Sequence, residues 1–183
     1  MEIISSLILG IGLSACCGFR VFVPMLVTNI AALMGHYHFG TGFEWMGTLT
    51  AFYIFASATL LEIIAYYIPW VDNLLDYVAT PASIIAGTIL TTAFISGDLS
   101  PTLKWVLGFL VGGGSAGIVQ LGTNITRLTS TATTAGFANP ILATIENLFS
   151  IIFSILSVFL PIFLAVLAVL FVMYLDKKLV RRL

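Results

Sequence analysis

The sequence is poor in charged residues, cysteine and histidine. Only 8% of its 183 residues are charged, seven Lys/Arg against eight Asp/Glu, whereas about 25% is usual in a soluble domain. Hydrophobic residues make up 60% of the chain, and the mean hydropathy is +1.12. A formal net charge of −1 leaves no basic face for a nucleic-acid partner. These values exclude an ordinary soluble domain and predict a protein embedded in the lipid bilayer.

Residues suited to metal binding or catalysis are scarce. Cys16 and Cys17 are adjacent in an apolar run, which favours a packing role over a disulfide or a zinc site. His36 and His38 stand two apart in a glycine-rich stretch with Glu44, a pattern more typical of a solvated loop than of a metal site. No nucleophile or dinucleotide-binding motif is present. We therefore predict no enzyme, no metal and no cofactor.

Long apolar runs predict an all-α, polytopic membrane fold. A helix needs about 20 apolar residues to cross the hydrocarbon core, and the runs cover residues 3–34, 48–68, 81–95, 102–122 and 140–175. Two of them are too long for one straight span, so we expect about six helical segments, with five as the alternative, some of them broken or re-entrant. The whole chain, 1–183, forms one transmembrane domain in this interpretation.

Glycines and prolines mark the expected helix breaks. The first run should break between Gly18 and Pro24, because glycine loosens a helix and proline removes a backbone donor. Pro69 ends one span and Pro81 opens the next, short one. Asn139 and Pro140 predict a helix start, with asparagine as the N-cap.

Two further segments depart from a plain membrane span. Residues 123–136 are rich in threonine and contain Arg127, so we expect a re-entrant or broken element, or else a surface loop. Pro161 is expected to divide the last run. Residues 176–183 carry four basic residues and predict a tail on the cytoplasmic side of the membrane.

A weak internal similarity suggests two halves, 1–98 and 99–175. Residues 71–75 and 145–149 share a β-branched, acidic, Asn, Leu, large-apolar pattern, and an arginine, Arg20 or Arg127, lies upstream of each. Matching broken elements in two halves are typical of transporters built from inverted repeats. Chance similarity in an apolar sequence is the open alternative.

Several motifs together resemble a known family. They are Gly18-Phe19-Arg20 with Pro24, Glu62 with Pro69, Asp72 and Asp76, the Thr80-Pro81 pair, and Asn139-Pro140 followed by Glu146. The chain resembles, over nearly its whole length, the bacterial membrane family called domain of unknown function 4126. The resemblance implies a small multi-helix inner-membrane protein with no assigned activity. Tyr66 and Tyr67 stand where many members carry an Asp-Lys pair.

Six of the fifteen charged residues are expected in or beside the membrane, where each costs about 2.5–3.5 kcal/mol to insert. They are Arg20, Glu62, Asp72, Asp76, Arg127 and Glu146. This pattern favours a transporter or lipid-handling translocase for an anionic small molecule or lipid headgroup. The arginines would bind the anion, with Asn73 and Asn147 beside them, and the four acids would couple protons or cations.

The alternative is a non-transporting scaffold or assembly partner in which the same charges only pair with one another. Glycines at four-residue spacing in 108–122 favour close helix contact, within the chain or across a homodimer. The sequence decides neither the substrate nor the coupling ion nor the oligomeric state.

Overall fold

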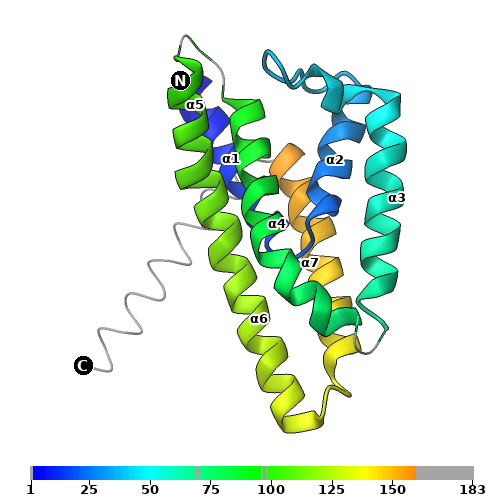
Figure 1. Cartoon of the computed structure of the whole chain (residues 1–183). Helices are drawn as coiled ribbons and strands as arrows, with labels where there is room; N and C mark the ends of the chain where they lie inside the picture. Colours follow the sequence, from blue (N-terminus) through cyan, green and yellow to red (C-terminus); the bar gives the residue numbers. More distant parts are fainter. Residues whose placement is uncertain (1, 69–70, 96, 98, 160–183) are drawn as a thin grey trace, which may run out of the picture.

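Every regular element that the structure describes is helical. The computed structural model describes residues 2–68, 71–95, 97 and 99–159 (Figure 1). Its helices are α1 (Glu2–Cys17), α2 (Phe22–Leu33), the short η1 (Glu44–Gly47), α3 (Leu49–Ala65), α4 (Val71–Phe94), α5 (Pro101–Leu107), η2 (Gly108–Gly113), α6 (Gly114–Thr134) and α7 (Asn139–Phe159). Since α5, η2 and α6 follow one another without a gap, the described residues form six long helices besides η1. The all-α fold class is confirmed.

Three of these helices are long and apolar enough to cross a membrane: Val71–Phe94, Pro101–Thr134 and Asn139–Phe159. Their outer faces carry large apolar side chains in the open, such as Leu110, Ile118 and Ile152. Exposed side chains of this kind suit contact with lipid. The chain is therefore a polytopic membrane protein.

The first apolar run is broken where the sequence predicts. α1 ends at Cys17 and α2 begins at Phe22. A Cβ on Gly18 would lie 2.6 Å from the Ala116 carbonyl oxygen, so this glycine lets the chain turn against α6. Pro24 is the third residue of α2, where its missing N–H would have no helical partner anyway.

Pro81 does not open a helix, and this prediction is wrong. α4 starts ten residues earlier, at Val71, and continues through Pro81 to Phe94. Hydroxyl groups supply hydrogen bonds to carbonyls around the proline: Ser83 Oγ donates to the Thr80 oxygen at 2.9 Å. Such substitutes allow proline inside a membrane helix. The expected breaks at Pro69 and Pro161, and the tail 176–183, lie outside the described residues.

The threonine-rich segment is a regular helix, which corrects the expectation of a broken or re-entrant element. α6 continues to Thr134, and Ala135 (φ 51°) then ends it. The hydroxyls of Thr126, Thr129 and Thr133 donate to carbonyls four residues back in the same helix, at 2.8–2.9 Å. Because the helix itself satisfies these polar groups, no water or loop is needed.

Glycines join α4 closely to the rod formed by α5, η2 and α6. A Cβ on Gly87 would lie 2.7 Å from the Gly112 oxygen, and one on Gly113 would lie 2.7 Å from Thr88 Oγ1. Gly114 and Gly122, in contrast, face open space. The glycine face of 108–117 is therefore occupied by α4 of the same chain. A homodimer through the rest of this segment stays a prediction.

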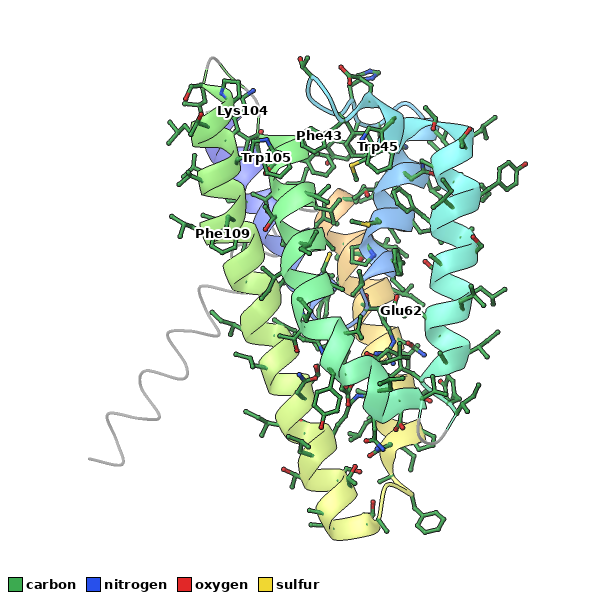
Figure 2. The ribbon with its side chains drawn as sticks, viewed as in Figure 1. Phe43, Trp45, Glu62, Lys104, Trp105 and Phe109 are labelled. Carbon is green, nitrogen blue, oxygen red and sulfur yellow. The ribbon has the colours of Figure 1, made fainter. Side chains whose placement is uncertain are left out.

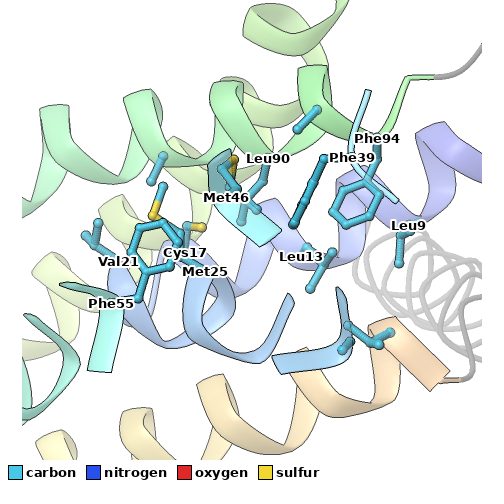
Figure 3. Packing of buried hydrophobic residues seen from close by; sticks show 14 of the residues in the cluster. Leu9, Leu13, Cys17, Val21, Met25, Phe39, Met46, Phe55, Leu90 and Phe94 are labelled. Atoms are coloured by element: carbon cyan, nitrogen blue, oxygen red, sulfur yellow. The ribbon is translucent and has the colours of Figure 1, made fainter. Parts of the chain in front are cut away.

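The apolar core lies between α1, α2 and α4 (Figure 3). Leu13 and Leu90 are fully buried in it, and the Ser14 hydroxyl ties α1 to α4 by donating to the Gly87 oxygen at 2.7 Å. Aromatic residues gather at one end of the bundle, where the Phe43 and Trp105 ring centroids are 5.7 Å apart (Figure 2). Arg127 and Glu146 lie elsewhere, on the parts of α6 and α7 nearer the turn that joins these helices.

Candidate functional site

Arg20, in the break between α1 and α2, is buried and fully occupied. Its side chain is 1% exposed. Its Nε donates to Asn147 Oδ1 at 2.5 Å, and its Nη2 donates to the Ala143 oxygen at 3.2 Å. Nη1 donates both to its neighbour's carbonyl, Phe19 O, and to Glu146 Oε2 at 2.9 Å. All three nitrogens of this guanidinium are therefore used within the protein.

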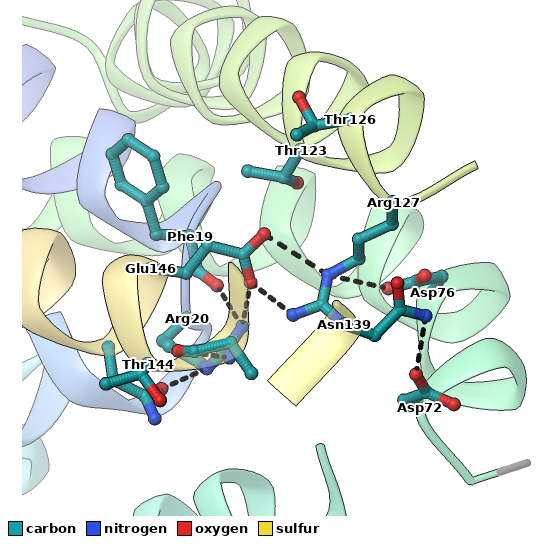
Figure 4. Close-up of polar contacts among 12 residues, drawn as sticks. Phe19, Arg20, Asp72, Asp76, Thr123, Thr126, Arg127, Asn139, Thr144 and Glu146 are labelled. Atoms are coloured by element: carbon teal, nitrogen blue, oxygen red, sulfur yellow. Dashed lines mark hydrogen bonds and ion pairs between the residues drawn. The ribbon is translucent and has the colours of Figure 1, made fainter. Parts of the chain in front are cut away.

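Glu146 on α7 joins the two arginines (Figure 4). Its Oε2 accepts hydrogen bonds from Arg20 and from Arg127 Nη2, and its Oε1 accepts from Arg127 Nε at 3.2 Å. Arg127 comes from α6, so one carboxylate connects α6, α7 and the α1–α2 break. Breaking such a pair inside a membrane leaves an uncompensated buried charge.

Tyr66, at the end of α3, lies against both guanidinium groups. Its ring centroid is 3.9 Å from Cζ of Arg20 and 4.4 Å from Cζ of Arg127. The residue is buried, and the negative face of an aromatic ring attracts a cation. Tyr66 therefore holds the two positive charges close together alongside Glu146.

Asp72 and Asp76 lie one turn apart on α4, as their spacing predicts, but they have different partners. Asp76 Oδ1 is 3.8 Å from Arg127 Nε and makes no hydrogen bond. Asp72 Oδ1 accepts from the backbone N–H of Asn73 at 2.7 Å, and Oδ2 accepts from Asn139 Nδ2 at 3.0 Å. The two guanidinium groups thus form ion pairs with two carboxylates, those of Glu146 and Asp76. Asp72 is joined to the edge of this cluster through Asn139, and with Asp72 included the cluster has one surplus negative charge when all are ionised.

Asn139 begins α7, as predicted, but it is not the N-cap, and this part of the prediction is wrong. It is the first residue of the helix, and its Nδ2 donates to Asp72 and to Thr131 Oγ1 at 3.2 Å. The hydroxyl of Thr134 accepts the backbone N–H of Ala138 instead, at 3.2 Å. The amide therefore links α7 to α4 and α6.

A pocket of about 560 Å³ opens beside the cluster, at the end of the bundle where α6 turns into α7. Most of its surface is apolar, but six of its lining residues are polar, and we call it the polar pocket. This volume is in the usual range for a small-molecule site. The polar residues that line it are Tyr66, Tyr67, Asp72, Asn73, Thr131 and Asn139. The cluster and the pocket share Tyr66, Asp72 and Asn139, so the charges lie directly behind the pocket wall.

Three buried polar atoms in or beside the cluster have no hydrogen-bond partner. They are Arg127 Nη1, Asp76 Oδ1 and Asn139 Oδ1. Buried polar groups in proteins are nearly always paired, and each exception needs an explanation. One donor and two acceptors of the cluster therefore have no hydrogen-bond partner within the described residues.

Glu62 has a separate role. Its Oε1 accepts from the backbone N–H of Val21 at 2.7 Å, and its Oε2 accepts from that of Phe22 at 3.0 Å. A carboxylate at the positive end of a helix is stabilising. Glu62, reaching from α3, thus anchors the start of α2 (Figure 2).

The remaining candidates are divided between the pocket, the cluster and the loop. Asn73 lines the pocket, while Asn147 is buried and holds Arg20 and the Tyr67 hydroxyl. Glu44 Oε2 accepts the N–H of Gly42 at 2.8 Å. In the part of the chain that the structure describes, no three His, Cys, Asp or Glu residues are placed to hold a metal ion.

The sequence reasoning missed Tyr66, Thr131 and the role of Asn139. A signal existed for Asn139: it stands seven residues before Glu146, and this spacing places both on one face of a helix. Tyr66 was notable only for standing where many family members carry the first residue of an Asp-Lys pair. A tyrosine near a helix end is equally typical of a membrane interface, so this position did not predict a contact with the arginines.

The fold and the site together define a polytopic, all-helical membrane protein with a buried cluster of charges beside a polar pocket. Residues 7–178 match the family model described as Domain of unknown function (DUF4126), and the chain belongs to this family. Neither the curated proteins nor the solved structures include a match to the chain.

Proposed function

We propose that this protein is a membrane transporter for an anionic small molecule or lipid headgroup, and that a proton or cation moves with the anion. The observation that carries the proposal is the set of three unpaired atoms on Arg127, Asp76 and Asn139 beside the polar pocket. A guanidinium donor suits a carboxylate or phosphate oxygen.

Arg127 is the better anion-binding candidate of the two arginines. Arg20 uses all its nitrogens within the protein, so its role is to position Glu146 and Tyr66. Arg127 keeps Nη1 free and is shared between Glu146 and the more distant Asp76. An incoming anion therefore competes with Asp76 for Arg127.

Asp76 is the best candidate for the coupling proton. Glu146 is paired with two arginines, and both oxygens of Asp72 accept hydrogen bonds. A proton on Asp76 Oδ1 removes the surplus negative charge of the cluster and releases Arg127 from one of its two carboxylates. The anion and the proton then bind together, which is the basis of symport.

The experiment is anion-driven proton uptake into liposomes that contain the purified protein and a trapped pH indicator. Inorganic phosphate and a series of short carboxylates are added outside. We expect lumen acidification with at least one of these anions, and its loss in Asp76→Asn, a variant that keeps the shape of the side chain. Lys104→Gln, at the far end of the bundle, is the matched control. Wild-type protein that moves no anion, or an Asp76→Asn variant with unchanged coupling, refutes the proposal.

A scaffold is the second candidate, and the complete pairing of Arg20 is the observation in its favour. If every anion fails to be transported while the variants unfold more easily, the charges serve only to hold the helices together. The transporter proposal also includes a location in a bacterial inner membrane, a cytoplasmic C-terminus and an inverted repeat. Cysteine labelling from each side of intact cells tests the orientation.

A further inference from the structure

We propose that the transported anion is amphiphilic, and that its hydrocarbon chain lies in a lateral groove between α3 and α4 while its charged head occupies the polar pocket. The inference rests on the proposed function and names the substrate class. The lateral groove, of about 320 Å³, is lined by apolar side chains of both helices, among them Ala58, Leu61, Leu75 and Val78. Two of these, Leu61 and Val78, are more than half exposed, so the groove opens towards lipid.

The groove and the polar pocket meet at Tyr66, which lines both. On one side of this residue are the Asp72 carboxylate and the amides and hydroxyls of the pocket, and on the other are alanine, leucine and valine side chains. The Tyr66 ring itself lies against the guanidinium groups of Arg20 and Arg127. A molecule with a charged head and an apolar chain matches this division, with its head nearest the arginines.

The single carboxylate of the groove does not oppose an apolar occupant. Both oxygens of Glu62 accept backbone N–H groups of Val21 and Phe22, so the charge is directed at the start of α2. Apart from Glu62 and Tyr66 the lining of the groove is apolar, so a hydrocarbon chain can lie against it.

The length of the groove favours a hydrocarbon chain over a helix of a partner protein. On α3 the lining extends from Ala58 to Tyr66, which is about 12 Å at about 1.5 Å per residue. A partner's transmembrane helix is about 30 Å long and would need a longer contact face. A single alkyl chain fits the shorter distance.

The test uses the full-length protein in lipid nanodiscs and a ten-carbon alkanesulfonate that carries a photoreactive diazirine at the end of its chain. A sulfonate stays anionic at every pH used, so the probe does not change its charge. We expect crosslinks on groove residues such as Leu61 and Val78. Decanesulfonate should compete with labelling, and methanesulfonate should compete at least tenfold less well, because it lacks the chain.

A matched pair of variants on α3 locates the chain. Ala58→Phe fills the groove and should reduce labelling at least tenfold. Ser57→Phe adds the same ring at the preceding residue, which is exposed and does not line the groove. The Ser57 hydroxyl donates to carbonyls of its own helix. Labelling should therefore persist in this variant. Ser57→Phe should also retain phosphate-driven or carboxylate-driven proton uptake, because Ser57 lines neither the groove nor the polar pocket.

Other outcomes overturn the inference. Labelling spread equally over lipid-facing residues such as Leu110 and Ile118, or equal competition by both sulfonates, refutes a chain-binding groove. If Ala58→Phe instead changes the oligomeric state measured by light scattering, the groove binds a partner helix. In these cases the proposed function still stands if anion-driven proton uptake is observed. Specific labelling of the groove without any anion flux refutes the proposed function instead.

Discussion

Replacement of Gly87 by alanine is expected to separate α4 from the rod formed by α5, η2 and α6. The added Cβ would lie 2.7 Å from the Gly112 carbonyl oxygen and 2.8 Å from the Ala116 Cβ. Ordinary contact begins at about 3.4 Å, so the helices must move apart by roughly 0.7 Å, because neither neighbour can rotate away. Overpacking of this kind costs typically about 1–3 kcal/mol.

The same change also weakens neighbouring contacts. The Gly87 carbonyl accepts the Ser14 hydroxyl at 2.7 Å, and this hydroxyl lies 2.8 Å from Thr91 Oγ1. A shift of α4 therefore lengthens the link to α1 as well. We expect the free energy of unfolding of Gly87→Ala to be about 1–3 kcal/mol lower than that of a glycine-to-alanine change at an open helical site, which shares the gain in helix propensity.

The assay is reversible unfolding in mixed micelles, followed by circular dichroism, with Gly122→Ala as the control. Gly122 lies in α6 and faces open space. Alanine should there be neutral or stabilising, because glycine is the poorer helix former by about 1 kcal/mol. Equal stability of the two variants would show that α4 and the rod are not closely packed, and would refute the reasoning.

Three further predictions concern single contacts. Glu146→Gln removes the carboxylate that joins the two arginines, and unfolding in micelles should become easier by about 3–5 kcal/mol. Glu62→Ala leaves the first N–H groups of α2 without their carboxylate. Hydrogen exchange at Val21 should accelerate by roughly tenfold, in line with a helix cap worth about 1 kcal/mol. Unchanged exchange argues against the anchoring role. Burial raises the pKa of Tyr37, so its hydroxyl remains a donor to the Val158 oxygen, at 2.5 Å. Tyr37→Phe should lower the free energy of unfolding by about 0.5–1.5 kcal/mol. Unchanged stability would mean that water replaces this bond.

Composition and apolar run length were sufficient to predict an all-helical membrane protein and the break after Gly18. The sequence-based predictions were wrong where one local pattern is compatible with two structures. Pro81 can start a helix or lie inside one when neighbouring hydroxyls bond to the carbonyls, and the sequence does not show which occurs. The threonines of α6 appear polar in the sequence, but each can donate to its own helix and face lipid.

The sequence indicated which charges matter more clearly than how they pair. Arg20, Arg127, Asp76 and Glu146 come together in one cluster, and Asp72 is joined to its edge through Asn139. The distances between the helices decide that Glu146 pairs with both arginines and that Glu62 binds backbone N–H groups instead. Close packing at glycines such as Gly87 sets the distances between helices. The periodicity of the sequence alone does not predict these distances.

The short turn after Thr134 has a consequence for how the protein enters the membrane. Arg127 and Glu146 lie on the two arms of one helical hairpin, α6 and α7, and pair with each other across it. Each charge alone costs about 2.5–3.5 kcal/mol to insert, but the hairpin brings both signs into the bilayer at once. Arg20 lies on a different segment and finds its carboxylate only when the two segments meet. The α6–α7 hairpin thus contains both members of an ion pair, whereas Arg20 depends on packing between segments for its counter-ion.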